Sequence, residues 1–271
     1  MTAILSVTPE DLYLFNLPFV VYSWWKIGAN CVILWTKPDV LPIEKMELVS
    51  QHLGDSPRLY IDAPSRKAAT YAQCARLYGA ALPFIPENEI LVTGDADMCV
   101  FSPLFRDLSH NDKVIHIIGK DLVPDGQLPM CYIMATAKEW RRAMKIDGRT
   151  VQQCVDELLK DIEAENFRGN YWSKDQEEAY NHITEYAKKG DDAAPIMYHS
   201  RASSGTQLAS LRADRDGWPQ YLHEPIIDAH LPRPGNTEEN FQKIKRLFQE
   251  IYPNNDHSWM DEYYKQYNAI Q

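Results

Sequence analysis

Positive charge is scarcer in this sequence than a nucleic-acid-binding protein needs. Its 28 Lys and Arg residues are outnumbered by 38 Asp and Glu residues, which gives a formal net charge of -10 at pH 7. A protein whose main task is to hold a nucleic-acid backbone usually has the opposite balance. Any anionic ligand must therefore be held locally, by a metal ion or by a few basic side chains.

Long apolar runs and paired cysteines are also missing. No stretch approaches the roughly 20 apolar residues that cross a bilayer. The first residues do not follow the pattern of a secretory signal peptide, so we expect a soluble, cytoplasmic protein. The absence of a C-x-x-C pair argues against a zinc cluster and favours reduced, mostly buried thiols. The five cysteines are Cys31, Cys74, Cys99, Cys131 and Cys154.

The sequence does contain a regular alternation of apolar strands and helices. With 271 residues, 45% of them hydrophobic, it suits one large α/β domain. The alternation predicts a mostly parallel sheet with helices on both faces. The predicted strands are residues 3–7, 31–35, 59–63, 90–93, 114–118 and 130–135. The predicted helices are residues 12–28, 43–53, 65–82, 138–144, 150–164, a segment from about 173, and 237–251, while residues 191–235 are expected to be irregular.

The stretch "EILVTGDADMCV" ends an apolar strand with two acids, Asp95 and Asp97. Residues two apart in a strand point to the same side, so both carboxylates can converge where the strand leaves the sheet. Two carboxylates held together repel unless a cation or a proton lies between them, which suggests a hard divalent ion. A second D-x-D, Asp214 and Asp216 in "DRDG", follows no strand and serves as an internal comparison.

The run "TYAQCARLYGAALPFIPENEILVTGDADMCVFSPL" resembles the donor-site core of metal-dependent glycosyltransferases of the GT-A fold. It is most similar to the retaining galactosyltransferase and glycogenin-like group, in which a helix with a "YARL" stretch leads to a strand ending in D-x-D. The resemblance implies one GT-A-like domain, residues 1–271. Within it, residues 1–105 would be the nucleotide-sugar-binding half and residues 106–271 the acceptor-binding half.

The resemblance also implies roles for individual residues. Asp97 would bind Mn²⁺ or Mg²⁺, and Asp95 would contribute to the metal and to the ribose of a nucleotide-diphosphate sugar. The metal would act as a Lewis acid on the leaving diphosphate. Arg76 would point toward the donor, while Thr8 and Tyr13 would hydrogen-bond to and stack on the nucleotide. A helix-surface position for Arg76 and a core position for Tyr13 are the alternatives.

The segment "YWSKDQEEAY" is similar to the D-Q element that lies beside the reacting sugar in this group. The similarity assigns Asp175 and Gln176 to catalysis. An ordinary helix start is the alternative, with Ser173 as its cap and acids in the first turn.

A third metal ligand is expected from the segment "EPIIDAHLPRPG". The resemblance points to His230, with Asp228 as its orienting partner. The group's own pattern continues after its His with Gly, Lys, Pro and Trp, a series that this sequence lacks. His223 and His257 therefore stay open as alternative ligands.

Together these features predict a glycosyltransferase that moves a sugar from a nucleotide-diphosphate donor, first of all a UDP-sugar, onto a hydroxyl of a glycan or glycoprotein. Retention of anomeric configuration is expected, because the "ARL" and D-Q elements resemble the retaining group. Asp125, Met130 and Tyr132 are expected to shape sugar specificity, unless "MCYIMA" is only a core strand. A more distant similarity is to the capsid-glycan glycosyltransferases of large algal viruses.

Two other functions stay open. Haloacid-dehalogenase-like phosphohydrolases also place D-x-D after an apolar strand, although in that family it follows the first strand of the domain. A catalytically inactive nucleotide-sugar-binding protein of the same fold is the non-enzyme alternative. A P-loop NTPase is excluded, because the sequence contains no G-x-x-x-x-G-K-[ST] motif.

Overall fold

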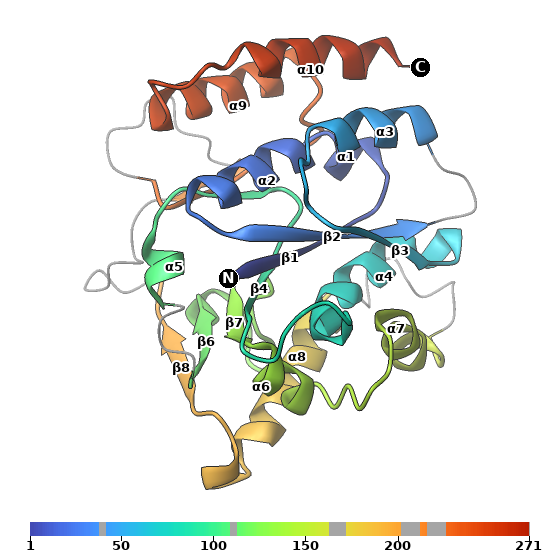
Figure 1. Cartoon of the computed structure of the whole chain (residues 1–271), viewed down its shortest axis with the longest axis vertical. Helices are drawn as coiled ribbons and strands as arrows, with labels where there is room; N and C mark the ends of the chain where they lie inside the picture. The colour runs from blue at the N-terminus through green and yellow to red at the C-terminus, as the bar shows by residue number, and fades with distance from the viewer. Residues whose placement is uncertain (38–41, 109–112, 163–171, 202–211, 216–225, 271) are drawn as a thin grey trace.

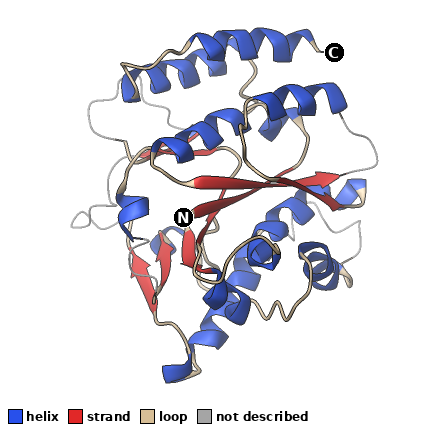
Figure 2. Ribbon diagram, viewed as in Figure 1, coloured by secondary structure: helices blue, strands red, loops and turns tan. Residues whose placement is uncertain are grey.

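The protein is built around a seven-stranded sheet with helices on both faces (Figures 1 and 2). This computed structural model describes residues 1–37, 42–108, 113–162, 172–201, 212–215 and 226–270. The strands are β1 (Thr2–Val7), β2 (Asn30–Lys37), β3 (Arg58–Asp62), β4 (Ile90–Gly94), β5 (Met98–Val100), β6 (Ile115–Ile118), β7 (Ile133–Thr136), β8 (Ile196–His199), β9 (Arg212–Ala213) and β10 (Asp228–His230). The main sheet has the order β3-β2-β1-β4-β7-β6-β8, and β5-β10-β9 form a smaller sheet.

Every neighbouring pair in the main sheet is parallel except the two that involve β7. The helices are α1 (Asp11–Leu14), α2 (Leu17–Lys26), α3 (Ile43–Gln51), α4 (Ala68–Ala75), α5 (Leu104–Leu108), α6 (Ala137–Ala143), α7 (Val151–Leu159), α8 (Lys174–Ala187), α9 (Glu238–Ile251) and α10 (Ser258–Ala269). Helices α1 to α3 cover one face, with α9 and α10 outside them, while α4, α6, α7 and α8 cover the other face (Figure 1). The predicted fold class is confirmed.

The apolar strands fill two separate cores, one on each side of the sheet. Along β1, Ala3, Leu5 and Val7 belong to the core beneath α2, whereas Ile4 belongs to the core beneath α4. A strand buried on both faces has apolar residues at consecutive positions, and this continuous run allowed the strand to be predicted from the sequence. The core beneath α2 combines residues from both predicted halves of the chain, and the division into halves stays a prediction.

The predicted helix at residues 65–82 is interrupted. Helix α4 ends at Ala75, and a 3-10 segment, Arg76–Ala81, follows it with non-helical backbone angles at Tyr78 (φ -108°, ψ 16°). Gly79 lies directly against β1, where a Cβ atom would come within 2.7 Å of two Ile4 side-chain atoms. The close approach of this segment to the sheet places the Arg76 side chain near the carboxyl ends of β1 and β4.

The C-terminal part contains more regular structure than the sequence predicted. Strands β8, β9 and β10 lie within the stretch expected to be irregular, and α10 was not predicted at all. Helix α10 is held to the N-terminal segment by Tyr263 Oη, which donates to Phe15 O at 3.0 Å, and by Tyr267 Oη, which donates to Asp11 Oδ1 at 2.7 Å. Within the described residues, no helix combines the length and apolar character needed to cross a membrane.

Gly94 ends β4 immediately before Asp95, and its position requires the absence of a side chain. A Cβ atom there would lie 2.6 Å from Leu5 Cδ2 on the neighbouring strand. We expect Gly94→Ala to lower the free energy of unfolding by about 1–3 kcal/mol through overpacking, measured by urea titration. Combining it with Leu5→Val should cost less than the two single changes together; full additivity would contradict this explanation.

Candidate active site

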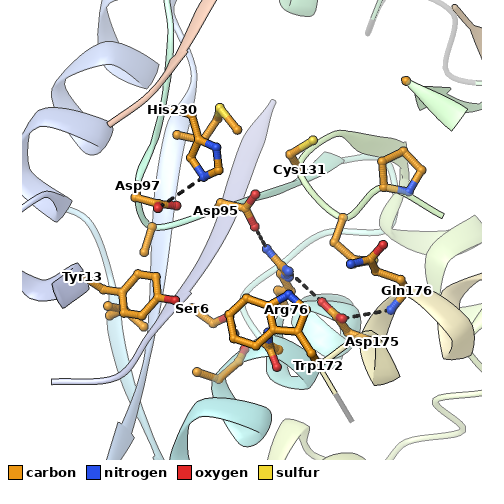
Figure 3. Close-up of a pocket in the computed structure, with 18 of the residues that line it drawn as sticks. Ser6, Tyr13, Arg76, Asp95, Asp97, Cys131, Trp172, Asp175, Gln176 and His230 are labelled. Carbon is orange, nitrogen blue, oxygen red and sulfur yellow. Dashed lines mark hydrogen bonds and ion pairs between the residues drawn. The ribbon is translucent and has the colours of Figure 1, made fainter. Parts of the chain in front are cut away.

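A cavity of about 350 Å³ opens where β1, β4 and β6 end. Its walls include Ser6 to Thr8 at the end of β1, Asp95 to Met98 after β4, and Gly119 after β6. Carboxyl ends of strands in α/β sheets are the usual place for ligands, and the volume lies within the roughly 300–1,000 Å³ of small-molecule sites. Figure 3 shows the side chains that converge there.

Arg76 joins two carboxylates at the base of this cavity (Figure 3). Its Nη1 contacts Asp95 Oδ1, and its Nη2 donates to Asp175 Oδ2 at 2.6 Å. Asp175 is 1% exposed and comes from the first turn of α8, where the helix dipole favours an acid. The two interpretations of this acid therefore coincide, since it is both a helix-start residue and part of the pocket. Ser173 occupies the N-cap position of the helix, as that alternative expected, but its hydroxyl makes no capping hydrogen bond and donates instead to Glu177 Oε1 at 2.8 Å.

The two carboxyl groups bound to Arg76 have pKa values shifted in opposite directions. Burial opposes ionisation of Asp95, but the charge and hydrogen bonds of Arg76 outweigh it and hold the pKa of Asp95 below its usual value. Burial raises the pKa of Asp175 above its usual value, even though Arg76 acts in the opposite direction. Neighbouring acids with pKa values pushed apart are a common property of catalytic sites, although structural ion pairs also produce it.

Asp97 lies among three basic side chains at the other end of the cavity. Its Oδ2 is 2.9 Å from Arg215 Nη1, 3.2 Å from Arg233 Nε and 3.3 Å from His230 Nε2. The antiparallel pairing of β10 with β5 sets His230 opposite Met98, which brings its ring to Asp97. Asp95 and Asp97 therefore lie toward different ends of one pocket: Asp95 contacts Arg76, and Asp97 contacts this basic cluster.

Asp228 does not orient His230 as the sequence suggested. It is fully buried and binds two arginines through both carboxylate oxygens. Arg201 donates to it at 2.5 and 2.9 Å, and Arg212 at 3.0 and 3.3 Å. The His230 Nδ1 atom instead lies 3.8 Å from Asp214 Oδ1. Both arginines line the cavity, so Asp228 fixes part of its wall.

The residues predicted to meet the nucleotide also line the cavity. The Arg233 guanidinium lies 4.7 Å from the centre of the Tyr13 ring, and Tyr13 is half-buried rather than a core residue. Thr8 is 3% exposed, and its Oγ1 has no hydrogen-bond partner among the described residues. A buried hydroxyl without a partner is costly, which makes Thr8 a natural contact for a bound polar ligand. Gln176 lines the same cavity.

Not all of the other residues singled out in the sequence line the cavity. Tyr132 lies just before β7, is fully buried and packs against Phe105 at 4.4 Å between ring centres, so it is a core residue; neighbouring Met130 does line the cavity. His257 Nε2 lies 2.9 Å from Tyr252 O at the start of α10, and this residue does not line the cavity. His223 lies outside the described residues.

The predicted metal ligands do not fit a divalent ion as the structure arranges them. Among the described residues no group of three or more His, Cys, Asp or Glu side chains is placed to hold one. Arg76 contacts Asp95, and the Asp97 oxygen that faces His230 also faces Arg215 and Arg233. A hard divalent ion needs several oxygen ligands, and guanidinium groups stay charged beside it. The assignment of Asp95, Asp97 and His230 as ligands stays a prediction.

Sequence reasoning missed four of the arginines that line the cavity. Arg201, Arg212, Arg215 and Arg233 all come from the stretch that was expected to be irregular. A signal for them was present, because residues 201–235 contain these four arginines and no lysine in a chain that is acidic overall. Arginine is the side chain best suited to bind phosphate groups through paired hydrogen bonds.

These features define a mixed α/β protein with an arginine-lined pocket at the carboxyl ends of its strands. No protein-family model and no curated protein sequence matches the chain. Two solved structures of LgtC are similar to it in fold. An active-site mutant has a TM-score of 0.49 at 14% identity, covering 96% of this chain and 99% of that one. The galactosyltransferase LgtC with donor and acceptor sugar analogues has a TM-score of 0.48 at 11% identity, covering 97% and 100%.

A third similar structure is the glycosyltransferase GlyE of Streptococcus pneumoniae. Its TM-score is 0.44 at 13% identity, with 99% of this chain and 63% of that chain covered. These likenesses concern the overall fold.

Proposed function

We propose that the protein is a glycosyltransferase that moves a sugar from a nucleotide-diphosphate sugar to a hydroxyl of a glycan. One observation carries the proposal: a single cavity holds basic groups and an aromatic ring at one end and two acids joined by Arg76 at the other. A donor of this class has the matching order of parts, with a base, a charged diphosphate and a neutral sugar.

The basic end suits the nucleotide part of such a donor. Arg215 and Arg233 provide hydrogen-bond donors for phosphate oxygens. Tyr13 offers a ring face for the base, and the Thr8 hydroxyl offers an unused hydrogen-bonding group. A UDP-sugar is our first choice of donor, and dependence on Mn²⁺ or Mg²⁺ stays a prediction.

The acidic end suits the sugar and its reacting carbon. Asp95 and Asp175, held by Arg76, would hydrogen-bond to sugar hydroxyls, and a fixed negative charge there would stabilise the positive charge that develops as the diphosphate leaves. Gln176 and the exposed Trp172 line the same end and would meet the acceptor. We propose retention of configuration, which proton NMR of the product anomer would test; an inverted product would overturn that part alone.

The activity test is release of a nucleoside diphosphate from a panel of UDP-, GDP-, CDP- and dTDP-sugars, with and without sugar acceptors. We expect release from one nucleotide class, faster when an acceptor is present. Asp175→Asn should slow it by about 10²- to 10³-fold, because a charge that acts on the transition state is lost. Nucleotide binding by the variant provides the control for folding.

Two outcomes would contradict the proposal. Release of inorganic phosphate from phosphomonoesters, with no turnover of any nucleotide sugar, would favour the phosphohydrolase alternative. Binding of one nucleotide without turnover of any of its sugars, under every metal condition tested, would favour a catalytically inactive binding protein.

A further inference from the structure

The basic side chains of the pocket are the positively charged partners of the D-x-D carboxylates. Two neighbouring carboxylates need a cation, and the sequence suggested a divalent metal. In the structure basic side chains lie beside both acids, Arg76 at Asp95, and Arg215, Arg233 and His230 around Asp97. Guanidinium groups cannot lose their charge at any ordinary pH, so they remain positive partners of these carboxylates.

The side chains that line the pocket include more basic than acidic groups. Five arginines but only three aspartates line it, in a chain whose net charge is -10. Asp228 binds Arg201 and Arg212 and offsets part of this excess, while Arg215 and Arg233 share a single carboxylate, Asp97. Their side chains are 24% and 17% exposed, which leaves them reachable from the cavity while Asp97 is only 4% exposed.

A divalent ion bound through Asp97 Oδ2 would have to displace this cluster. All three basic groups converge on one oxygen, Oδ2, at 2.9 to 3.3 Å. A metal ion on that oxygen would lie beside two permanent positive charges inside a largely buried site, where charges interact more strongly than in water. An incoming diphosphate is negatively charged, so the same groups would attract it and give it charge-assisted hydrogen bonds.

We propose that Arg215 and Arg233 bind the diphosphate of the donor directly, so that the nucleotide site works without a divalent metal ion. Asp97 then serves as the counter-charge that holds the two arginines in place before the donor enters. The inference rests on the proposed function, because it assumes a nucleotide-diphosphate ligand in this pocket. It assigns to Arg215 and Arg233 the task that the resemblance assigned to a metal.

The first test is calorimetric binding of UDP, GDP, CDP and dTDP to the full chain, in EDTA and in Mn²⁺. We expect one nucleotide to bind with a dissociation constant that changes less than about twofold between the two conditions. Arg215→Gln and Arg233→Gln should each weaken it by about 10- to 100-fold, the usual effect of losing a charge-assisted hydrogen bond. Arg246→Gln, on α9 away from the cavity, is the matched control and should leave it unchanged.

Binding of the corresponding nucleoside, which carries no phosphate, separates a phosphate contact from a general disturbance of the pocket. We expect the two arginine variants to bind the nucleoside as the unmodified protein does. Equal weakening of nucleoside and nucleotide would show that the arginines only support the pocket and would overturn the inference.

Asp97→Asn gives opposite results under the two mechanisms. If Asp97 is a counter-charge, asparagine still accepts hydrogen bonds from the arginines but no longer offsets their charge, so nucleotide binding in EDTA should be as tight or tighter. If Asp97 is a metal ligand, binding appears only with Mn²⁺ and the variant abolishes it, which would overturn the inference and leave the proposed function standing. If no nucleotide binds with or without metal, the proposed function itself fails.

Discussion

Replacing Arg76 with methionine is expected to lower the free energy of unfolding by about 3–5 kcal/mol, the range for breaking a buried ion pair by removing one partner. The Arg76 side chain is 9% exposed and Asp175 1% exposed, so methionine leaves a buried carboxylate without its counter-charge. Asp95 is more accessible, at 28%, and should contribute less. Urea unfolding measures the loss, and donor turnover should disappear with it.

The pH dependence of this loss identifies its cause. A carboxyl group whose folded-state pKa is raised contributes stability below its unfolded pKa, and that stability is lost as the pH rises through the folded value. Burial already raises the pKa of Asp175, and removal of Arg76 should raise it further. The deficit of Arg76→Met should therefore shrink as the pH falls from 7 toward about 4. A deficit that is constant with pH would point to lost packing instead.

Two further variants provide the controls. Arg76→Met with Asp175→Asn should recover part of the lost stability, because no buried charge is left alone at that position. Arg246→Met removes an arginine that pairs with Glu250 on the exposed surface of α9 and should change stability by less than about 0.5 kcal/mol. If the two single arginine variants lose similar amounts, the buried pair is not the reason.

The sequence predicted best those elements whose signal is local. Strands β1 and β4 are continuous apolar runs buried on both faces, and α9 begins where Thr237 caps it, its Oγ1 accepting from Asn240 N at 3.4 Å. Helix α10 was overlooked although Met260, Tyr263 and Tyr267 recur at helical spacing and are fully buried. The signal for this helix is therefore present in the sequence itself.

Strands β9 and β10 could not be predicted in the same way. They contain two and three residues, too few to show a period, and they exist because β10 pairs with β5 more than 100 residues earlier in the chain. The arginine cluster depends on that pairing, since β9 and β10 carry or adjoin Arg212, Arg215 and His230. The acids and His230 could be named from motifs, but their basic partners required the fold.

Asp228→Asn is expected to lower the free energy of unfolding by about 3–5 kcal/mol for the converse reason. The carboxylate of Asp228 is fully buried and joins Arg201 and Arg212, whose side chains are 4% and 20% exposed. Without it, the guanidinium groups of Arg201 and Arg212, which stay charged, face each other in the wall of the pocket.

Acid titration separates this effect from a general loss of packing. Burial opposes ionisation of Asp228, but the hydrogen bond of Arg201 and the charge of Arg212 outweigh it, so its pKa lies below the usual value. A depressed carboxyl pKa contributes stability that is complete above the unfolded pKa, near 4, and is lost as the pH falls through the folded value. The unmodified protein should therefore lose stability below about pH 4 more steeply than Asp228→Asn. Parallel stability curves in that range would show that the ionised Asp228 does not hold the two arginines together.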